Sequence, residues 1–125
     1  MTSSLKEVIS AYGAAWSEPD ADKRLALLTI AWSEDGLYQD PSGEAVGRQA
    51  LSDRIGGFHA QQPGARVELT SGFSEHHGKI YFSWRMLTPD GNVAINGVDF
   101  GTLDDEGRLT QIVGFFGPPP VIDPV

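Results

Sequence analysis

Apolar residues recur at helical intervals in the first half of the chain and at strand intervals in the second half. Near the start, the apolar positions are three or four residues apart, which is typical of an amphipathic helix: Leu5, Val8, Ile9, Tyr12 and Trp16. Ser4 and Glu7 have the spacing of a capping box, in which the two side chains satisfy free backbone N–H groups. We therefore predict a first helix from Ser4 to Ser17.

Two further helices are predicted in the first half of the chain. The second begins at Asp20 or Asp22, ends at Asp35-Gly36 and has an apolar stripe formed by Leu25, Leu28 and Trp32. The third runs from about Gly47 to Ala60 and is marked by Leu51, Ile55 and Phe58. Between them, Leu37–Asp40 is predicted to be a short extended segment, because Pro41 biases the preceding residue toward an extended backbone.

The second half of the chain has the alternation of antiparallel strands. The alternating positions come in two groups, Val67, Leu69 and Phe73, and then Ile80, Phe82, Trp84 and Met86. His76–Lys79 is predicted to be a hairpin tip, where the adjacent His76 and His77 would point to opposite faces, so we expect no metal site there. Two more strands, Val93–Leu103 and Leu109–Phe116, follow the turn signal Pro89-Asp90-Gly91 and flank a second turn.

Helices followed by strands predict an α+β fold, with three N-terminal helices packed on a curved, mainly antiparallel sheet. We expect this sheet to wrap into a conical α+β barrel, as a single domain over residues 1–125. The later strands are apolar on both faces, since Tyr81 and Leu87 alternate with Phe82, Trp84 and Met86. Both faces of such a sheet must be covered. We therefore expect the helices to cover one face and a second subunit to cover the other, in a homodimer.

Composition narrows the classes of ligand. The chain has 17 acidic and nine basic residues, a formal net charge of −8, and its bases are scattered, which argues against a nucleic-acid partner. We expect a neutral, apolar small molecule as ligand, because an anion would be repelled. The chain has no cysteine, no phosphate-binding loop and no His-Glu-x-x-His motif, so we expect neither metal nor cofactor. The absence of a signal peptide or long apolar run favours a cytoplasmic protein with no membrane partner.

Two aspartates stand in apolar surroundings. Asp99 lies within the strand Val93–Leu103, although aspartate is depleted in strands and a buried carboxylate needs a partner or a shifted pKa. By strand parity, Asp99 shares a face with small neighbours, Gly97 and Gly101, which leave room for a cavity. Asp40 precedes Pro41 in a second apolar segment. Two acids that titrate differently are the basis of acid–base chemistry, provided that they share one cavity.

Three segments resemble a known family. Ala11-Tyr12-Gly-Ala-Ala-Trp16, Gln39-Asp40-Pro41-Ser42-Gly43 and Val98-Asp99-Phe100 occur on an order of elements that resembles the nuclear transport factor 2-like, SnoaL-like superfamily. Within that superfamily, their motifs are most similar to those of the ketosteroid isomerases. The resemblance implies a cofactor-independent enzyme, with Asp40 as the proton-shuttling base and with Tyr12 and a protonated Asp99 as the oxyanion hole. Asn96, His59 and Trp84 depart from the isomerase pattern.

The ligand of such an enzyme would be an apolar molecule that carries a carbonyl group. Ligand cavities are mostly apolar, with a few polar groups. We expect the substrate-binding residues to come from the aromatic, aliphatic and imidazole side chains near the three candidate catalytic residues: Trp16, Phe58, His59, Phe82, Trp84, Ile112 and Phe116.

Other interpretations of the same residues stay open. A cyclase, dehydratase or epoxide hydrolase of the superfamily would use the same acids. The resemblance to the epoxide hydrolases implies an Asp-Arg-Asp arrangement in the cavity. Arg85 would supply the arginine only if it faced the cavity, and parity places it opposite Trp84. A non-enzymatic binding domain is the third possibility. In that case Asp40 is a turn residue before Pro41, and Tyr12 is core or forms a closed pair with Asp99.

Overall fold

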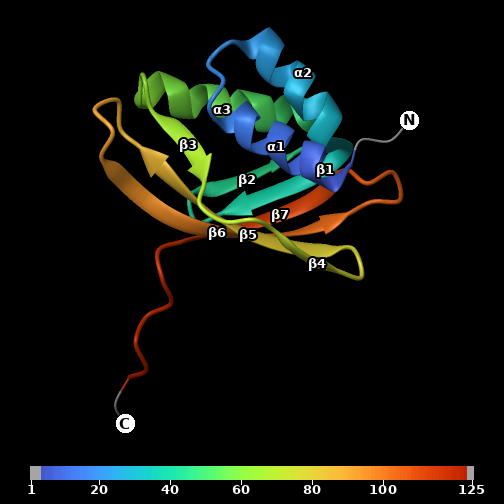
Figure 1. Ribbon diagram of the computed structural model, residues 1–125. Helices are drawn as coiled ribbons and strands as arrows, with labels where there is room; N and C mark the ends of the chain where they lie inside the picture. Colours follow the sequence, from blue (N-terminus) through green and yellow to red (C-terminus); the bar gives the residue numbers. More distant parts are fainter. Residues whose placement is uncertain (1–3, 124–125) are drawn as a thin grey trace.

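The structure is a computed structural model that describes residues 4–123, with three helices packed on one face of a seven-stranded sheet (Figure 1). The helices are α1 (Leu5–Trp16), α2 (Ala21–Ala31) and α3 (Arg48–Gln61). The strands are β1 (Trp32–Asp40), β2 (Gly43–Val46), β3 (Arg66–Leu69), β4 (Ser74–His76), β5 (Lys79–Leu87), β6 (Val93–Leu103) and β7 (Leu109–Phe116). This arrangement confirms the predicted class of three helices on a curved, mainly antiparallel sheet.

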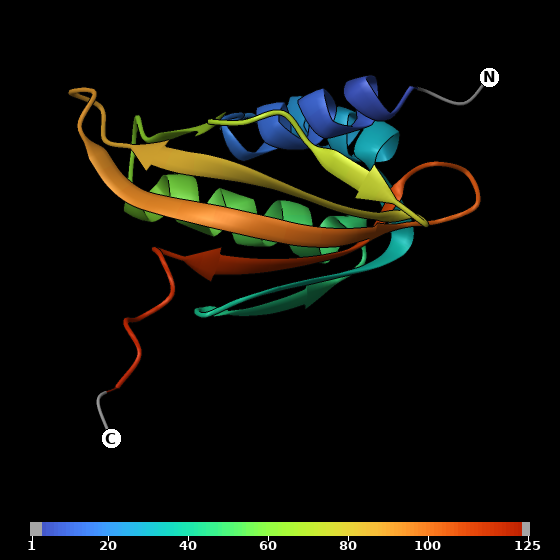
Figure 2. The ribbon, with the colours of Figure 1, turned by 60° about the horizontal axis from the view of Figure 1, so that its bottom comes forward.

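The sheet has the order β2-β1-β7-β6-β5-β3, and β4 also pairs with β5. All neighbours are antiparallel except β1 and β7, which are parallel although they lie far apart in the sequence. Figure 2 shows the long strands β5 and β6 curving past α3, with β7 and β1 beside them. The curvature leaves space between the helices and the inner face of the sheet.

The predicted caps of the first two helices are present. Ser4 and Glu7 form the capping box of α1, with the Glu7 backbone N–H donating to Ser4 Oγ at 3.2 Å. Asp20 caps α2, because its Oδ1 accepts from the backbone N–H groups of Asp22 and Lys23 at 2.9 and 3.2 Å. These side chains fix where both helices begin.

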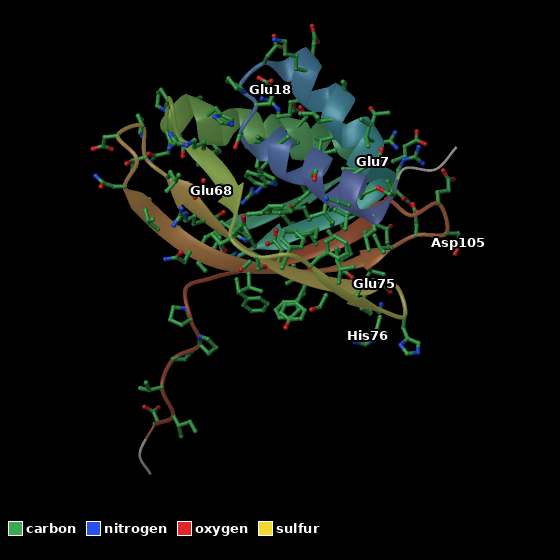
Figure 3. The ribbon with its side chains drawn as sticks, in the orientation of Figure 1. Glu7, Glu18, Glu68, Glu75, His76 and Asp105 are labelled. Atoms are coloured by element: carbon green, nitrogen blue, oxygen red, sulfur yellow. The ribbon has the colours of Figure 1, made fainter. Side chains whose placement is uncertain are left out.

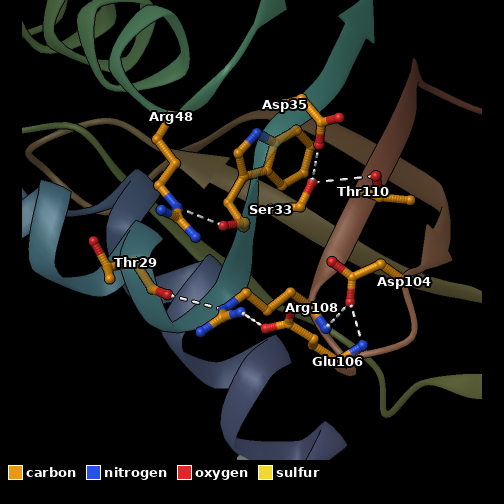
Figure 4. Close-up of polar contacts among 9 residues, drawn as sticks. Thr29, Ser33, Asp35, Arg48, Asp104, Glu106, Arg108 and Thr110 are labelled. Carbon is orange, nitrogen blue, oxygen red and sulfur yellow. Dashed lines mark hydrogen bonds and ion pairs between the residues drawn. The ribbon is translucent and has the colours of Figure 1, made fainter. Parts of the chain in front are cut away.

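The predicted end of the second helix is wrong. Helix α2 ends at Ala31, and Trp32 begins strand β1 rather than completing the apolar stripe. Arg48 Nε donates to the Trp32 carbonyl oxygen at 2.7 Å, and Ser33 Oγ and Thr110 Oγ1 are 3.1 Å apart, as Figure 4 shows. The pairing of β1 with β7 shifts register after Trp32, so β1 starts with an irregular segment that tolerates Asp35-Gly36.

The strands of the second half follow the sequence pattern closely, with local exceptions. Strands β6 and β7 have the predicted bounds, whereas β3 stops at Leu69, so Phe73 lies outside any strand. Strand β2 was not predicted. His76 and His77 lie at the expected hairpin tip, but their Nδ1 atoms are 3.1 Å apart. The expectation that their rings point to opposite faces is therefore wrong, because the turn at His77 breaks the strand alternation.

The two faces of the sheet have different surroundings. The inner face packs under the helices, where Trp32, Leu109 and Ile112 have no exposed surface. The outer face is uncovered and side chains project from it (Figure 3). Along their strands, Tyr81, Phe100 and Phe115 alternate with inward-facing residues, and their rings are about half exposed. None of the described helices is both long enough and apolar enough to cross a membrane.

Candidate active site

A cavity of about 790 Å³ lies between the helices and the inner face of the sheet. Its wall is built by α1, α3 and strands β1, β3, β5, β6 and β7, and most of it is aromatic or aliphatic. It contains the three candidate catalytic residues and most of the candidate substrate-binding residues: Tyr12, Asp40, Asp99, Trp16, Phe58, Phe82, Trp84 and Phe116. A wall of this kind suits an apolar ligand.

His59 and Ile112 do not line this cavity, contrary to the prediction. His59 Nε2 lies 2.8 Å from the backbone oxygen of Trp16, so the imidazole serves the end of α1. Ile112 is completely buried in the hydrophobic core. It lies two residues before Gly114 on the same face of β7. Both residues therefore stabilise the fold around the cavity and are not part of its wall.

The two aspartates lie in one row across three strands. Asp99 on β6 pairs with Gly114 on β7, and Gln39 pairs with Val113, so the next residue of β1 brings Asp40 beside Gly114. A Cβ atom on Gly114 would lie 2.9 Å from Asp99 Oδ1 and 3.5 Å from Asp40 Cβ. Glycine at this position therefore gives both acids access to the same end of the cavity.

Asp40 is held as an anion. Its Oδ1 accepts from Ser42 N and Ser42 Oγ at 2.7 and 2.6 Å and forms an ion pair with Arg54 Nη2 at 3.2 Å. Its Oδ2 accepts from the Tyr38 hydroxyl at 2.6 Å. Burial alone would raise the pKa of Asp40, but the hydrogen bonds from Ser42 and Tyr38 and the charge of Arg54 lower it below the ordinary value. Asp40 is thus both a turn residue, bonded to the backbone of Ser42, and a residue of the cavity wall.

Asp99 is in the opposite situation. Its carboxyl group is almost completely buried, and among the described residues it accepts one side-chain hydrogen bond, from Trp84 Nε1 to Oδ1 at 3.0 Å. Burial raises the pKa of Asp99 to about 7; the Trp84 hydrogen bond lowers it and the negative charge of Asp40 raises it further. Near neutral pH, Asp99 can therefore either release or accept a proton.

Tyr12 does not form the predicted hydrogen bond with Asp99. The Tyr12 ring stacks on Trp32, with ring centroids 5.8 Å apart, and its buried hydroxyl group makes no hydrogen bond to any described residue. Burial and the nearby charge of Asp99 raise its pKa well above 10.0, so the hydroxyl keeps its proton. A buried hydroxyl group with no partner is costly, and an oxygen of a bound ligand would satisfy it.

Several polar residues of the cavity wall were not singled out from the sequence, and three of them surround Asp40: Tyr38, Ser42 and Arg54. Tyr38 alternates inward with Asp40 on β1, which strand parity would have shown had the segment been recognised as a full strand. Arg54 comes from α3, and no sequence pattern links it to Asp40. Arg85, which was weighed as a partner for the acids, instead forms an ion pair with Glu68 of β3.

The sequence profile of the SnoaL-like domain matches residues 9–112, which span both aspartates and most of the sheet. This chain belongs to the SnoaL-like family. None of the curated proteins matches it significantly. The family assignment agrees with the resemblance that the three sequence segments indicate.

Solved structures support the same assignment. A candidate isomerase of the SnoaL-like family from Agrobacterium tumefaciens is 34% identical, with a TM-score of 0.83, and the match covers 89% of this chain and 95% of that chain. A candidate polyketide cyclase from Sinorhizobium meliloti has a TM-score of 0.67 at 15% identity, covering 86% and 92% of the two chains. A nuclear transport factor 2-like protein of unknown function from Cytophaga hutchinsonii has a TM-score of 0.66 at 12% identity, covering 94% and 96%. The last two show the fold alone.

Proposed function

We propose that this SnoaL-like protein is an isomerase that moves a proton on a neutral, apolar molecule carrying a carbonyl group. One observation supports this function most strongly: two carboxyl groups at one end of an apolar cavity titrate in different pH ranges, Asp40 below its ordinary pKa and Asp99 at a pKa of about 7. An acid–base catalyst works best when its pKa is close to the working pH, and Asp99 fulfils this condition. The candidate isomerase from Agrobacterium tumefaciens is consistent with the proposal.

In this proposal the roles implied by the ketosteroid isomerases are exchanged. Both oxygens of Asp40 are occupied by donors and its pKa is lowered, which makes it a weak base. Asp99 has a free oxygen, because its only described side-chain hydrogen bond goes to Oδ1. Ionised Asp99 therefore takes the proton from the carbon next to the carbonyl, and Asp40 is the fixed anion that keeps Asp99 basic.

The carbon–hydrogen electrons then move into the carbonyl system and leave a negative oxygen. The Tyr12 hydroxyl group, which lacks a described partner, donates to that oxygen. Asp99 returns the same proton to a different carbon, so the product is an isomer of the substrate and the enzyme is unchanged. The aromatic wall holds the ring system of the substrate by apolar contact.

The assay supplies an unconjugated steroid enone and follows the appearance of conjugation by absorbance. Asp99→Asn is expected to lower kcat by at least 10²-fold, as expected when a general acid–base group is removed. Asp40→Asn should keep a larger part of the activity and move the pH profile to lower pH, because the anion that raises the pKa of Asp99 is gone. Loss of activity in Asp40→Asn with little loss in Asp99→Asn would contradict the exchanged roles and restore those of the isomerases.

A hydrolase is the second candidate, and the ion pair between Asp40 and Arg54 favours it. In an epoxide hydrolase, an anion of this kind activates water while a neutral acid, here Asp99, protonates the epoxide oxygen. Turnover of a cyclic epoxide to its diol, with no isomerisation of the enone, would select this function. Saturable binding of both compounds without turnover of either would instead indicate a non-enzymatic binding domain.

We also propose that the protein is a homodimer through the outer face of the sheet. Tyr81 and Phe100 stack with ring centroids 5.5 Å apart, and Phe115 meets Phe100 edge to face at 6.2 Å. All three rings are about half exposed, so they form an apolar surface that water covers in the isolated chain. We call Tyr81, Phe100 and Phe115 the outer aromatic cluster.

A further inference from the structure

Trp84 lines the cavity and forms a hydrogen bond with the carboxyl group of Asp99. It lies on β5 and faces the cavity, next to Phe82, which pairs with Asp99 across the sheet. Its indole Nε1 donates to Asp99 Oδ1 at 3.0 Å. Among the described residues, this is the one side chain that forms a hydrogen bond with the Asp99 carboxyl group.

The indole ring of Trp84 is fixed in its orientation by the strands on which it lies. Trp84 pairs with Gly97 on β6, and Gly97 pairs with Phe116 on β7. A Cβ atom on Gly97 would come within 2.2 Å of the indole Cζ2 atom, so the ring occupies the space that a side chain would fill. Phe116 closes the other side edge to face, with centroids 5.9 Å apart. The indole therefore packs closely on Gly97 and Phe116, with its N–H directed at Asp99.

The chemistry of an indole decides where the proton of Asp99 resides. An indole N–H can donate a hydrogen bond but cannot accept one. Oδ1 is therefore an acceptor in both charge states of Asp99. The carbonyl oxygen of a protonated carboxyl group is a better acceptor than its hydroxyl oxygen, so the indole favours the proton on Oδ2. A tyrosine hydroxyl at the same place would allow either oxygen to carry the proton, because a hydroxyl group also accepts.

We propose that Trp84 is a positioning residue that occupies Oδ1 of Asp99, so that Oδ2 alone exchanges the proton with a ligand. The inference rests on the proposed function only in assigning proton exchange to Asp99; the contact itself does not depend on the reaction.

The titratable groups that face Asp99 are few. They are Tyr12 from α1 and Tyr38 and Asp40 from β1, and Arg54 from α3 reaches Asp40. Burial raises the pKa of both tyrosines, whereas the hydrogen bonds to Asp40 lower its pKa. None of these three acids changes charge near neutral pH, so a neutral titration observed at Trp84 reports Asp99.

The test is a pH titration of the ¹⁵N-labelled protein that follows the indole N–H resonances of Trp16, Trp32 and Trp84, the last identified with Trp84→Phe. The Trp84 resonance is expected to move with a midpoint near 7 in the natural protein and to stay constant in Asp99→Asn. Asparagine keeps an acceptor oxygen for the indole and cannot titrate, which makes this variant the matched control. A Trp84 resonance that does not titrate, or that titrates equally in Asp99→Asn, would overturn the proposal.

A second measurement follows the carboxyl carbon of Asp99 by ¹³C resonance in Trp84→Phe. Loss of a donor that favours the charged form should raise the midpoint of Asp99 by about half a unit to one unit. An unchanged or lower midpoint would contradict the inference. Neither measurement needs a substrate, so failure of the enone assay and failure of this inference remain separate results. If Trp84→Phe does not fold, the Trp84 resonance is assigned by triple-resonance experiments on the natural protein, and the titration of the natural protein against Asp99→Asn decides alone.

Discussion

The buried carboxyl group of Asp99 makes the stability of the fold depend on pH. Its pKa of about 7 is above the ordinary value of 3.8, so between these values the folded chain holds a proton that the unfolded chain has released. Stability therefore falls as the pH rises through this window, and the loss is complete above about 7. At pH 8 we expect the free energy of unfolding of Asp99→Asn to exceed that of the natural protein by ~4 kcal/mol at most. The variant should therefore unfold at a higher denaturant concentration.

Urea unfolding at several pH values checks this expectation at the residue scale. The gain from Asp99→Asn should shrink toward pH 4, where the natural protein is also protonated at this position. Asp40 does not interfere, because its lowered pKa places its own titration below this window. A difference between the two proteins that is the same at pH 4 and pH 8 would show that Asp99 is not buried as a neutral acid.

At this scale the sequence allowed the location of the site to be predicted but not its contacts. Strand parity placed Asp99 on one face with Gly97 and Gly101, because alternation is a property of the backbone, and the structure shows that this face lines the cavity. The partner of Asp99 was wrongly predicted to be Tyr12, and it is Trp84, since a hydrogen bond depends on how rings pack. Arg54 was missed for the same reason, because a helix residue reaches Asp40 only once α3 has docked on the sheet.

Among the elements, the row that joins β1, β7 and β6 brings the two acids together. Gly114 is its central position, and Gly114→Ala would place a Cβ atom 2.9 Å from Asp99 Oδ1. The carboxyl group must then shift from its present position, which disturbs its hydrogen bond with Trp84 Nε1. We expect the proposed isomerase activity to fall at least tenfold while stability falls by about 1–3 kcal/mol. Enone turnover and thermal unfolding measure the two effects separately.

Gly72→Ala is the matched control for this prediction. A Cβ atom on Gly72 would meet nothing within 4 Å, and this glycine lies outside the strands. Activity should therefore stay at the natural level. Equal losses in Gly114→Ala and Gly72→Ala would show that the row of acids tolerates a side chain at its centre.

The same row shows which elements the sequence pattern can predict. Helices α1 and α3 and strands β6 and β7 have strong periodicity and clear ends, so they were predicted within a residue or two. The start of β1 was missed, because Trp32 continues the helical spacing of Leu28 while its backbone is already extended. What ends the helix is tertiary: the Trp32 carbonyl oxygen bonds to Arg48 and its ring packs on Tyr12.

For the whole molecule, the uncovered face of the sheet predicts the oligomeric state. Phe100→Asp would place a charge in the centre of the outer aromatic cluster, where a second copy would have to bury it twice. We expect this variant to sediment as a monomer at concentrations where the natural protein is a dimer. The indole titration of Trp84 should survive in the monomer, because the cavity lies on the other face.

Ile30→Asp is the control at this scale. Ile30 is 43% exposed, similar to Phe100 at 48%, but it lies on α2 in the helix layer. Its substitution adds the same charge without touching the sheet, so the dimer should persist. Dissociation by both variants would point to a general effect of charge, and a natural protein that sediments as a monomer would contradict the dimer itself.

The parallel pairing of β1 with β7 has a consequence for the order in which the molecule is made. Tyr38 pairs with Ile112, so Asp40 meets its neighbour on the β7 side only after nearly the whole remaining chain has been made, although its pairing with Gly43 is local. Such distant pairing comes late and slows folding. During synthesis the two acids meet only after β7 has left the ribosome, and a nascent chain that stops before Gly114 holds Asp40 and Asp99 without the strand that joins them. The row that joins the two acids is therefore complete only after the last strand is in place.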